Sequence, residues 1–240
     1  MTDFLNINRG SATVETESIG GGGRKIYESN VYAATVKQAY LDAYESGAKF
    51  CSVTLTVDGE DYEERLLLSN KQGEGFFTDR DGKQVPFSSL VRFDELIFAA
   101  GFPSAQAAGL GQGNVRVWDK DTKSFILKPH QYVLTGLQGK EVLVALLKRK
   151  QNKQKKNDLT GKYDKINEVE ETNSIEKFAN LQKQTQLEAA KNVNPPTFMA
   201  AWHEKWNGKI LDTYKEQANA PTQGTPQAKA TAAAAGNLFG

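Results

Sequence analysis

The residues with the clearest chemical character lie between positions 148 and 156. This run, Lys148-Arg149-Lys150-Gln151-Asn152-Lys153-Gln154-Lys155-Lys156, holds six positive charges and no negative one. Clustered Lys and Arg side chains pair with the phosphates of nucleic acids and give affinity without sequence specificity. A run of this kind also occurs where lysines only keep a hairpin soluble. Because the Gln and Asn residues between the cations cannot pack into a core, we expect a flexible basic loop that contacts phosphates.

Aromatic side chains near other cations could supply base stacking, the second component of single-strand binding. Each stacked base contributes roughly 1–3 kcal/mol. Phe76 and Phe77 are adjacent in a charged, glycine-flanked loop and are the strongest candidates. Further candidates are Phe50, on the non-core face of the predicted second strand, and Tyr62, which flanks a hairpin near Arg65. Ordinary packing is the alternative for every one of these rings. Additional phosphate contacts are expected from Arg65, Lys71 and Arg80.

The sequence offers few groups for catalysis or metal binding. Cys51 is the only cysteine, and the alternating pattern around it places it in a core. The two histidines, His130 and His203, are far apart and have no cysteine near them, which excludes a Cys/His zinc site. Since no nucleophile motif accompanies either histidine, we expect no catalytic residue, no cofactor and no metal.

Three strands that could position these side chains are predicted before position 70. Residues 31–40 have few turn formers, and residues 50–57 alternate strictly between apolar and other side chains. Residues 62–69 follow a hairpin signal at Asp58-Gly59. The side chains expected to face the core are Cys51, Val53, Leu55, Val57, Leu66 and Leu68.

A helix and two more strands are predicted after these. Ser88 or Ser89 could cap a helix that ends at Gly101 and buries Phe93, Leu96, Ile97 and Ala100. Residues 140–150 and 163–170 are the fourth and fifth strands, and 115–118 is a short strand candidate. The order of three strands, a helix and two strands is that of a five-stranded OB-fold barrel. The fold class is therefore mainly β, with an inserted helix.

Composition divides the chain into four segments. We expect a flexible N-terminal arm at residues 1–30 and an OB-fold domain at residues 31–178. A C-terminal helical segment should follow at residues 179–216, and a low-complexity, disordered tail at residues 217–240. The glycine run at 20–23 is interpreted as a linker because no Ser or Thr follows Lys25, as a phosphate loop would require.

Two apolar features lie in the C-terminal part of the chain. Phe198, Trp202 and Trp206 recur at helical spacing, and we expect this stripe to dock a C-terminal helix on the barrel or on a second subunit. Leu238 and Phe239 end an otherwise polar tail, a pattern that suits weak recognition of a partner protein.

Net charge and hydropathy limit the class of protein. The chain has 240 residues, 30 Lys and Arg against 29 Asp and Glu, and a formal charge of +1. This balance excludes a histone-like basic protein, so a nucleic-acid site must be a local patch. With 39% hydrophobic residues the chain can build a core, and no uncharged apolar run is long enough to span a membrane. The N-terminus lacks the layout of a signal peptide, and we expect a cytoplasmic protein.

Four short sequences occur in a recognisable order. They are Gly20-Gly21-Gly22-Gly23, Leu68-Ser69-Asn70-Lys71-Gln72-Gly73-Glu74, Trp202-His203-Glu204-Lys205-Trp206-Asn207-Gly208-Lys209 and Asn237-Leu238-Phe239-Gly240. Together they resemble single-stranded DNA-binding proteins of tailed bacteriophages, over most of the chain from about residue 20. The resemblance implies an OB fold, roles in DNA replication and recombination in the host cytoplasm, and no catalytic activity. It also implies contacts with replication proteins through the tail.

The tail departs from the acidic end of many replication-type single-strand binders. Residues 217–240 contain one lysine and no carboxylate. A tail contact with replication or recombination proteins would therefore rest on Leu238 and Phe239.

Our leading hypothesis is a protein that binds and protects single-stranded DNA without sequence specificity. The alternative is a phage structural or adaptor protein whose β-domain binds other proteins, with the lysine run as solvated surface. An RNA-binding OB protein is a third hypothesis, because backbone and stacking contacts serve both polymers.

Overall fold

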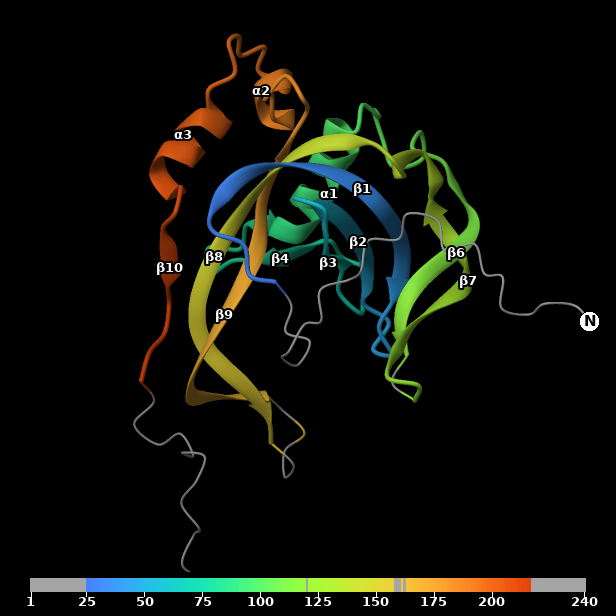
Figure 1. Cartoon of the computed structure of the whole chain (residues 1–240), viewed down its shortest axis with the longest axis vertical. Coiled ribbons are helices and arrows are strands. Elements are labelled where there is room, and N and C mark those ends of the chain that lie inside the picture. The colour runs from blue at the N-terminus through green and yellow to red at the C-terminus, as the bar shows by residue number, and fades with distance from the viewer. Residues whose placement is uncertain (1–24, 120, 158–160, 162, 217–240) are drawn as a thin grey trace, which may run out of the picture.

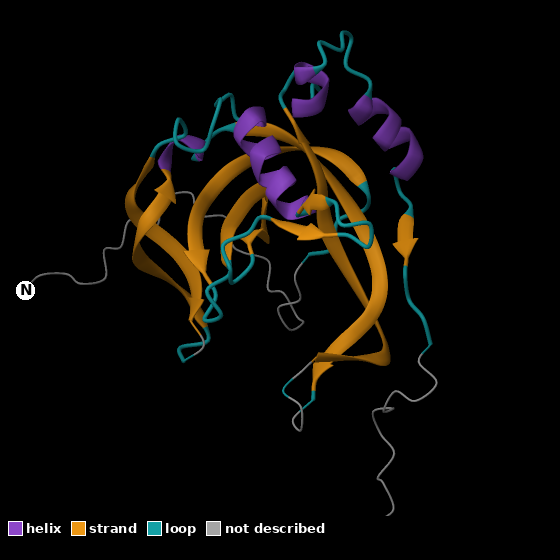
Figure 2. Ribbon diagram, turned by 180° about the vertical axis from the view of Figure 1, so that it is seen from behind, coloured by secondary structure: helices purple, strands orange, loops and turns teal. Residues whose placement is uncertain are grey.

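The computed structural model describes residues 25–119, 121–157, 161 and 163–216 (Figure 1). The predicted tail, with Leu238 and Phe239, lies outside the described residues. The strands are β1 (Asn30–Ala43), β2 (Lys49–Val57), β3 (Glu60–Ser69), β4 (Phe76–Thr78), β5 (Gln84–Pro86), β6 (Leu110–Asp119), β7 (Ser124–Leu134), β8 (Glu141–Lys156), β9 (Tyr163–Ala179) and β10 (Ile210–Asp212). The helices are α1 (Ser88–Ala99), α2 (Gln186–Ala190) and α3 (Phe198–Trp206), with a 3-10 turn η1 at Thr135–Leu137 (Figure 2). The fold is mainly β, as predicted.

Strand β1 organises an antiparallel sheet. One edge of β1 pairs with β2, which pairs in turn with β3. The other edge pairs with β8 from Asn30 to Thr35 and with β7 at Tyr40. Strand β8 also pairs with β9 and, in parallel, with β10, while β6 and β7 form a hairpin of their own. Figures 1 and 2 show the β6–β7 and β8–β9 hairpins on opposite sides of β1, β2 and β3.

The sheet is open between β3 and β9, because no backbone pairing joins these two strands in the described part of the chain. Helix α1 packs against both strands and covers the opening. The Glu64 carboxylate on β3 accepts a 2.8 Å hydrogen bond from the backbone N–H of Ile175 on β9. Glu95 on α1 is ion-paired with Lys177 of β9. Burial raises the pKa of Glu95, while Lys177 acts in the opposite direction.

The core follows the predicted alternation. Cys51, Val53, Leu55, Val57 and Leu66 are fully buried, and Leu68 packs against them partly buried. These side chains lie on the face of β2 and β3 that α1 covers through Phe93, Leu96 and Ile97. The inward-facing residues identified from the sequence are therefore confirmed.

Helix α1 begins and ends close to the predicted positions, but its cap differs. The residue before its first turn is Phe87, which has no side-chain capping bond. Ser89 instead donates its hydroxyl to the Leu67 carbonyl oxygen at 2.7 Å and ties the helix to β3. Gly101 has a φ of +87°, which favours glycine, and ends the helix as predicted.

The predicted flexible N-terminal arm extends too far, because residues 25–30 are packed. The Tyr27 ring is buried in the core. Its backbone N–H and carbonyl oxygen bond to the side-chain amide of Asn173 on β9, at 2.7 and 2.8 Å. Ser29 is fully buried and donates its hydroxyl to the Lys209 carbonyl oxygen. The first described residues are thus held between β9 and the C-terminal segment.

Helix α3 packs on the outer face of β8, as the aromatic stripe predicted. Trp202 and Met199 are buried against Ala145 and Leu147, which point away from the main core. Phe198 stays more exposed and lies beneath the Lys177 ammonium group. The C-terminal helical segment is therefore part of the same packed unit as the sheet.

A buried carboxylate joins α2 to α3. Glu188 accepts hydrogen bonds from the backbone N–H groups of Thr197 and Phe198 at the start of α3, at 2.7 and 2.8 Å. It also completes a capping box with Thr185. Burial alone would raise the pKa of Glu188, but these hydrogen bonds outweigh it and lower the pKa.

Replacing Leu96 by Ala should lower the free energy of unfolding by about 2–5 kcal/mol, because this fully buried side chain fills the space under the open edge of the sheet. Urea unfolding followed by circular dichroism would measure the loss. Leu127 is the matched control, since it is 69% exposed and its change to Ala should stay within about 0.5 kcal/mol. A small effect of Leu96→Ala would contradict the packing of α1.

Glu188→Gln should lower the free energy of unfolding at neutral pH by about 1–3 kcal/mol, because the ionised acceptor is lost. A carboxyl with a lowered folded pKa stabilises the fold above its ordinary value of 4.5, and this contribution disappears as the pH falls through the folded pKa. The difference between wild type and variant should therefore shrink below about pH 4.5. The exposed Glu204→Gln variant on the same segment is the control, and it should change the free energy of unfolding at neutral pH by no more than about 0.5 kcal/mol.

Candidate functional site

The basic run at 148–156 is a strand, which contradicts the predicted flexible loop. Strand β8 continues to Lys156, which pairs with Tyr163 at the start of β9. Carboxylates on β9 and two neighbouring segments neutralise four of the six cations. The ion pairs are Lys148 with Glu28 (2.9 Å) and Glu171 (3.2 Å), Arg149 with Glu176 (2.7 Å), Lys150 with Asp212 (3.0 Å) and Lys153 with Glu168 (3.0 Å). Because carboxylates of the facing strand pair with these cations, the basic run is ordered as part of β8.

Two cations at the far end of the run differ from the others. Lys155 and Lys156 are exposed, and no carboxylate among the described residues lies within ion-pairing distance of either. Between them and the sheet, Asn152 is buried and its side chain bonds to both the N–H and the carbonyl oxygen of Lys215. The extension is therefore held rigidly up to Asn152, and free positive charge remains near its tip.

Phe50 and Tyr62 are buried, so the prediction that they stack on bases is wrong. Phe50 is 4% exposed, with its ring 4.5 Å from that of Tyr44 and the Arg65 guanidinium above it. Tyr62 is 1% exposed and donates its hydroxyl to Glu64 at 2.6 Å. Tyr62 lies four residues before Leu66, so the two-residue alternation of β3 places both side chains on the core face.

The remaining predicted DNA-binding residues lie in the segment that connects β3 to α1, apart from the groove described below. Phe76 is partly buried and Phe77 is half exposed on β4, where Phe77 is stacked with Phe87 at 6.5 Å. Lys71 and Arg80 are exposed in the turns of this excursion. None of these predicted site residues lines the groove that contains Arg65.

A groove of about 1050 Å³ lies between the outer face of β1, β2 and β3 and the β6–β7 hairpin. Lys37, Thr54 and Arg65 of the sheet line it, together with Lys25. The hairpin contributes Arg116, Trp118 and Phe125. The groove therefore combines cations and aromatic rings from segments that are far apart in the sequence.

Trp118 and Phe125 are the exposed aromatic pair of the groove. They pair directly across β6 and β7, with ring centroids 5.2 Å apart in an edge-to-face arrangement. Trp118 is 54% exposed and Phe125 is 48% exposed, so both rings are accessible. The Arg116 guanidinium lies 4.2 Å above the Phe125 ring. Flat rings beside a cation can accept an unpaired base and its phosphate.

Sequence reasoning missed these rings although a signal was present. Val115 is buried and Val117 packs partly, so the alternating Arg116 and Trp118 must face the opposite side. The segment was predicted as a short strand, but its partner β7 was not, because Pro129 and a charged turn interrupt the apolar pattern. Without β7, nothing indicated that Phe125 would lie beside Trp118.

The hairpin is fixed over the sheet by polar contacts. The Gln38 side chain accepts a 2.7 Å hydrogen bond from the Arg116 N–H and donates a 3.3 Å bond to the Arg116 carbonyl oxygen. Asp61 on β3 binds Lys37 at 2.7 Å and Arg116 at 2.9 Å. These contacts join β1, β3 and β6, so the protein's own side chains hold the hairpin over the sheet.

Charges in the groove are balanced. Its lining cations are Lys25, Lys37, Arg65 and Arg116, and its lining carboxylates are Glu60, Asp61, Glu63 and Glu64. Most of the carboxylates have internal roles: Glu63 accepts from the Ser52 hydroxyl and Glu64 from Tyr62 and Ile175. The groove therefore has no excess of positive charge that would bind anions of every kind.

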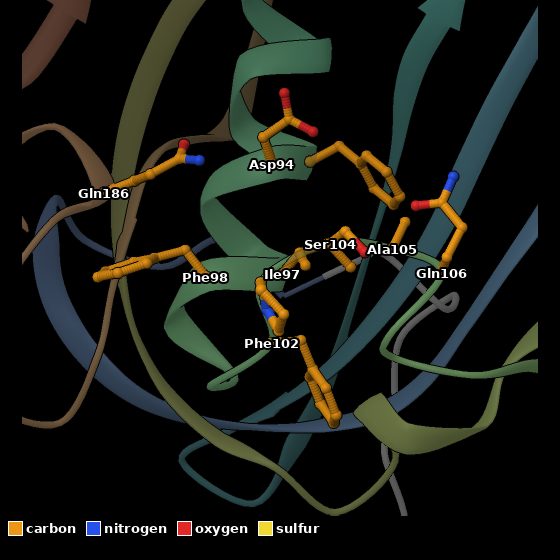
Figure 3. A pocket seen from close by; sticks show the side chains of 10 residues that line it. Asp94, Ile97, Phe98, Phe102, Ser104, Ala105, Gln106 and Gln186 are labelled. Carbon is orange, nitrogen blue, oxygen red and sulfur yellow. The ribbon is translucent and has the colours of Figure 1, made fainter. Parts of the chain in front are cut away.

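A second cavity, of about 440 Å³, lies over α1 (Figure 3). Its walls include Phe98, Phe102 and Ile97, and Asp94 is the one charged residue that lines it in the described part of the chain. Burial raises the pKa of the Asp94 carboxyl. Because this charge is negative and no cation among the described residues lines the cavity, the cavity does not suit a nucleic acid.

Catalytic groups do not gather in the described part of the chain. No three His, Cys, Asp or Glu side chains come together there as metal ligands. Burial raises the pKa of the Cys51 thiol, which opposes formation of a thiolate. Within the described helices, none is both long and apolar enough to cross a membrane.

Comparisons with known proteins give no further guide to function. No family model matches the chain, and no curated protein sequence matches it at a significant level. Function is therefore inferred from the groove and from the order of the strands.

Proposed function

We propose that this protein binds single-stranded DNA without sequence specificity, in the groove between the β1–β3 face and the β6–β7 hairpin. The observation that carries the proposal is the pair of half-exposed rings, Trp118 and Phe125, beside Arg116. Bases without a partner strand expose flat faces that stack on such rings, whereas bases in a duplex do not. Arg65 and Lys25 contact phosphates along the same groove.

The connectivity supports an OB-type fold. Strands β1, β2, β3, β8 and β9, with α1 after the third, follow the order of that barrel, and β1 pairs with both β2 and β8. In this assignment the gap between β3 and β9 is the closing seam of the barrel, spanned by α1 and by Glu64. OB folds bind oligonucleotides over the face of their second and third strands. The groove lies over that face.

The resemblance to bacteriophage single-stranded DNA-binding proteins suggests a biological setting. In that setting the protein protects single-stranded DNA during phage DNA replication and recombination in the host cytoplasm. Leu238 and Phe239 are proposed to contact a replication or recombination protein. An adaptor function is the alternative, favoured by the exposed apolar side chains Leu127 and Tyr132 on the same hairpin.

Trp118→Ala and Phe125→Ala should each weaken binding of labelled oligo-dT by about 5- to 150-fold, because each removes a stacking platform worth roughly 1–3 kcal/mol. Fluorescence anisotropy would measure the affinity, with circular dichroism to verify folding. Tyr132→Ala is the matched control, since this ring is on the same hairpin and equally exposed but does not line the groove. Phe77→Ala tests the site predicted from sequence and should leave affinity unchanged.

Titration of the wild type with oligo-dT, oligo-rU and duplex DNA separates the candidate functions. Tighter binding to oligo-dT than to duplex is expected. Absence of binding to all three would contradict the proposal and favour the adaptor. Equal affinity for duplex would rule out stacking, and folded Trp118 and Phe125 variants with unchanged affinity would place the site elsewhere.

The tip of the β8–β9 hairpin should contribute phosphate contacts on longer strands. Each cation that pairs with a phosphate of a single strand adds about 0.7 to the slope of log K against log salt. Lys155→Gln combined with Lys156→Gln should therefore reduce the slope for a long oligo-dT by about 1.4. Lys148→Gln is the control, because Glu28 and Glu171 already neutralise that ammonium. An unchanged slope in the double variant would exclude the tip from the binding surface.

A further inference from the structure

The carboxylate of Asp61 occupies a position in the groove that resembles that of a bound phosphate. Its Oδ1 and Oδ2 atoms accept hydrogen bonds from the Lys37 ammonium group at 2.9 and 2.7 Å. Its Oδ2 atom also accepts from the Arg116 guanidinium at 2.9 Å. One anion thus holds two cations that line the groove, one from β1 and one from β6.

The position of Arg116 makes this contact relevant to ligand binding. Its guanidinium lies over the Phe125 ring while it binds Asp61. A strand whose base stacks at Phe125 or Trp118 carries its phosphate within the length of one nucleotide of this cation. The phosphate and the Asp61 carboxylate therefore compete for the same donors.

We propose that Asp61 acts as an internal competitor for DNA phosphate, which lowers the affinity of the groove for polyanions until base stacking favours the exchange. The inference rests on the proposed function. Phosphate displaces Asp61 from Lys37 and Arg116. The binding free energy gained in this exchange is small, because each new ion pair with phosphate replaces an ion pair with Asp61. Base stacking then decides which polyanion binds, so strands with accessible bases are preferred over duplex.

The three side chains are too exposed for the cluster to serve mainly as a source of stability. The exposed fractions are 48% for Lys37, 47% for Arg116 and 32% for Asp61. Ion pairs at this exposure contribute little to the free energy of unfolding. The hairpin also keeps its Gln38 hydrogen bonds without Asp61. Removing the carboxylate should therefore change binding more than folding.

Asp61→Asn tests the inference through affinity and salt dependence. Binding to oligo-dT at low salt should become about 3- to 10-fold tighter, because phosphate no longer has to displace a carboxylate. The slope of log K against log salt should steepen, by at most about 1.4, because binding no longer breaks two internal ion pairs that salt also weakens. The preference for oligo-dT over duplex should fall. Asp61→Glu keeps the charge and should retain the wild-type slope.

Glu204→Gln is the control, because it removes the same charge from a residue outside the groove. Glu204 lies on α3, is exposed and makes no ion pair with any described residue. Its effect on affinity should stay below about twofold, since only the long-range field changes. Thermal unfolding of each variant verifies that the fold is intact.

The outcomes separate this inference from the proposed function. If wild type binds oligo-dT and Asp61→Asn behaves like Glu204→Gln, Asp61 is no competitor and the DNA-binding function stands. Weaker binding by folded Asp61→Asn would also overturn the inference, because Asp61 would then position Arg116 for DNA. If Asp61→Asn binds oligo-dT and the wild type does not, the result supports competition. If neither protein binds oligo-dT, both proposals are overturned.

Discussion

The fold depends on how the unpaired edges of β3 and β9 are satisfied. A buried backbone N–H without a partner costs about 1–3 kcal/mol, so an open sheet needs acceptors at its gap. Glu64 supplies one acceptor to Ile175, and α1 covers the remaining opening with an apolar face and with Glu95. Strand β9 stays paired with β8 from Tyr163 to Ala179, so the basic end of β8 belongs to the same sheet.

Many of the described cations are neutralised by nearby carboxylates. Four of the six cations of the basic run are ion-paired, three of them with β9, and Lys37 and Arg116 of the groove bind Asp61. A polyanion therefore meets few free positive charges before it contacts the rings of Trp118 and Phe125. Such a surface suits a ligand recognised by its accessible bases, since backbone charge alone would favour duplex and single strands similarly.

Prediction from the sequence succeeded where the pattern is local. Alternation placed Cys51 and Leu66 in the core, and helical spacing placed Trp202 on a packed face. It failed for Tyr62, which was treated as a flank of the hairpin although its parity matches Leu66. It also failed for the basic run, because that prediction leaves out the acidic residues of β9, which pair with the run 15 to 27 positions later.

The sequence alone determined the mainly β class, the three-strand start, α1 and the inward faces of the strands, because these follow from the spacing of neighbouring residues. Only the tertiary structure decided which exposed residues meet. Arg65 on β3 shares a groove with Trp118 and Phe125 because β6 and β7 fold back over the sheet, and Asp61 reaches Arg116 for the same reason. Contacts between distant segments depend on strand pairing, which a local pattern cannot specify.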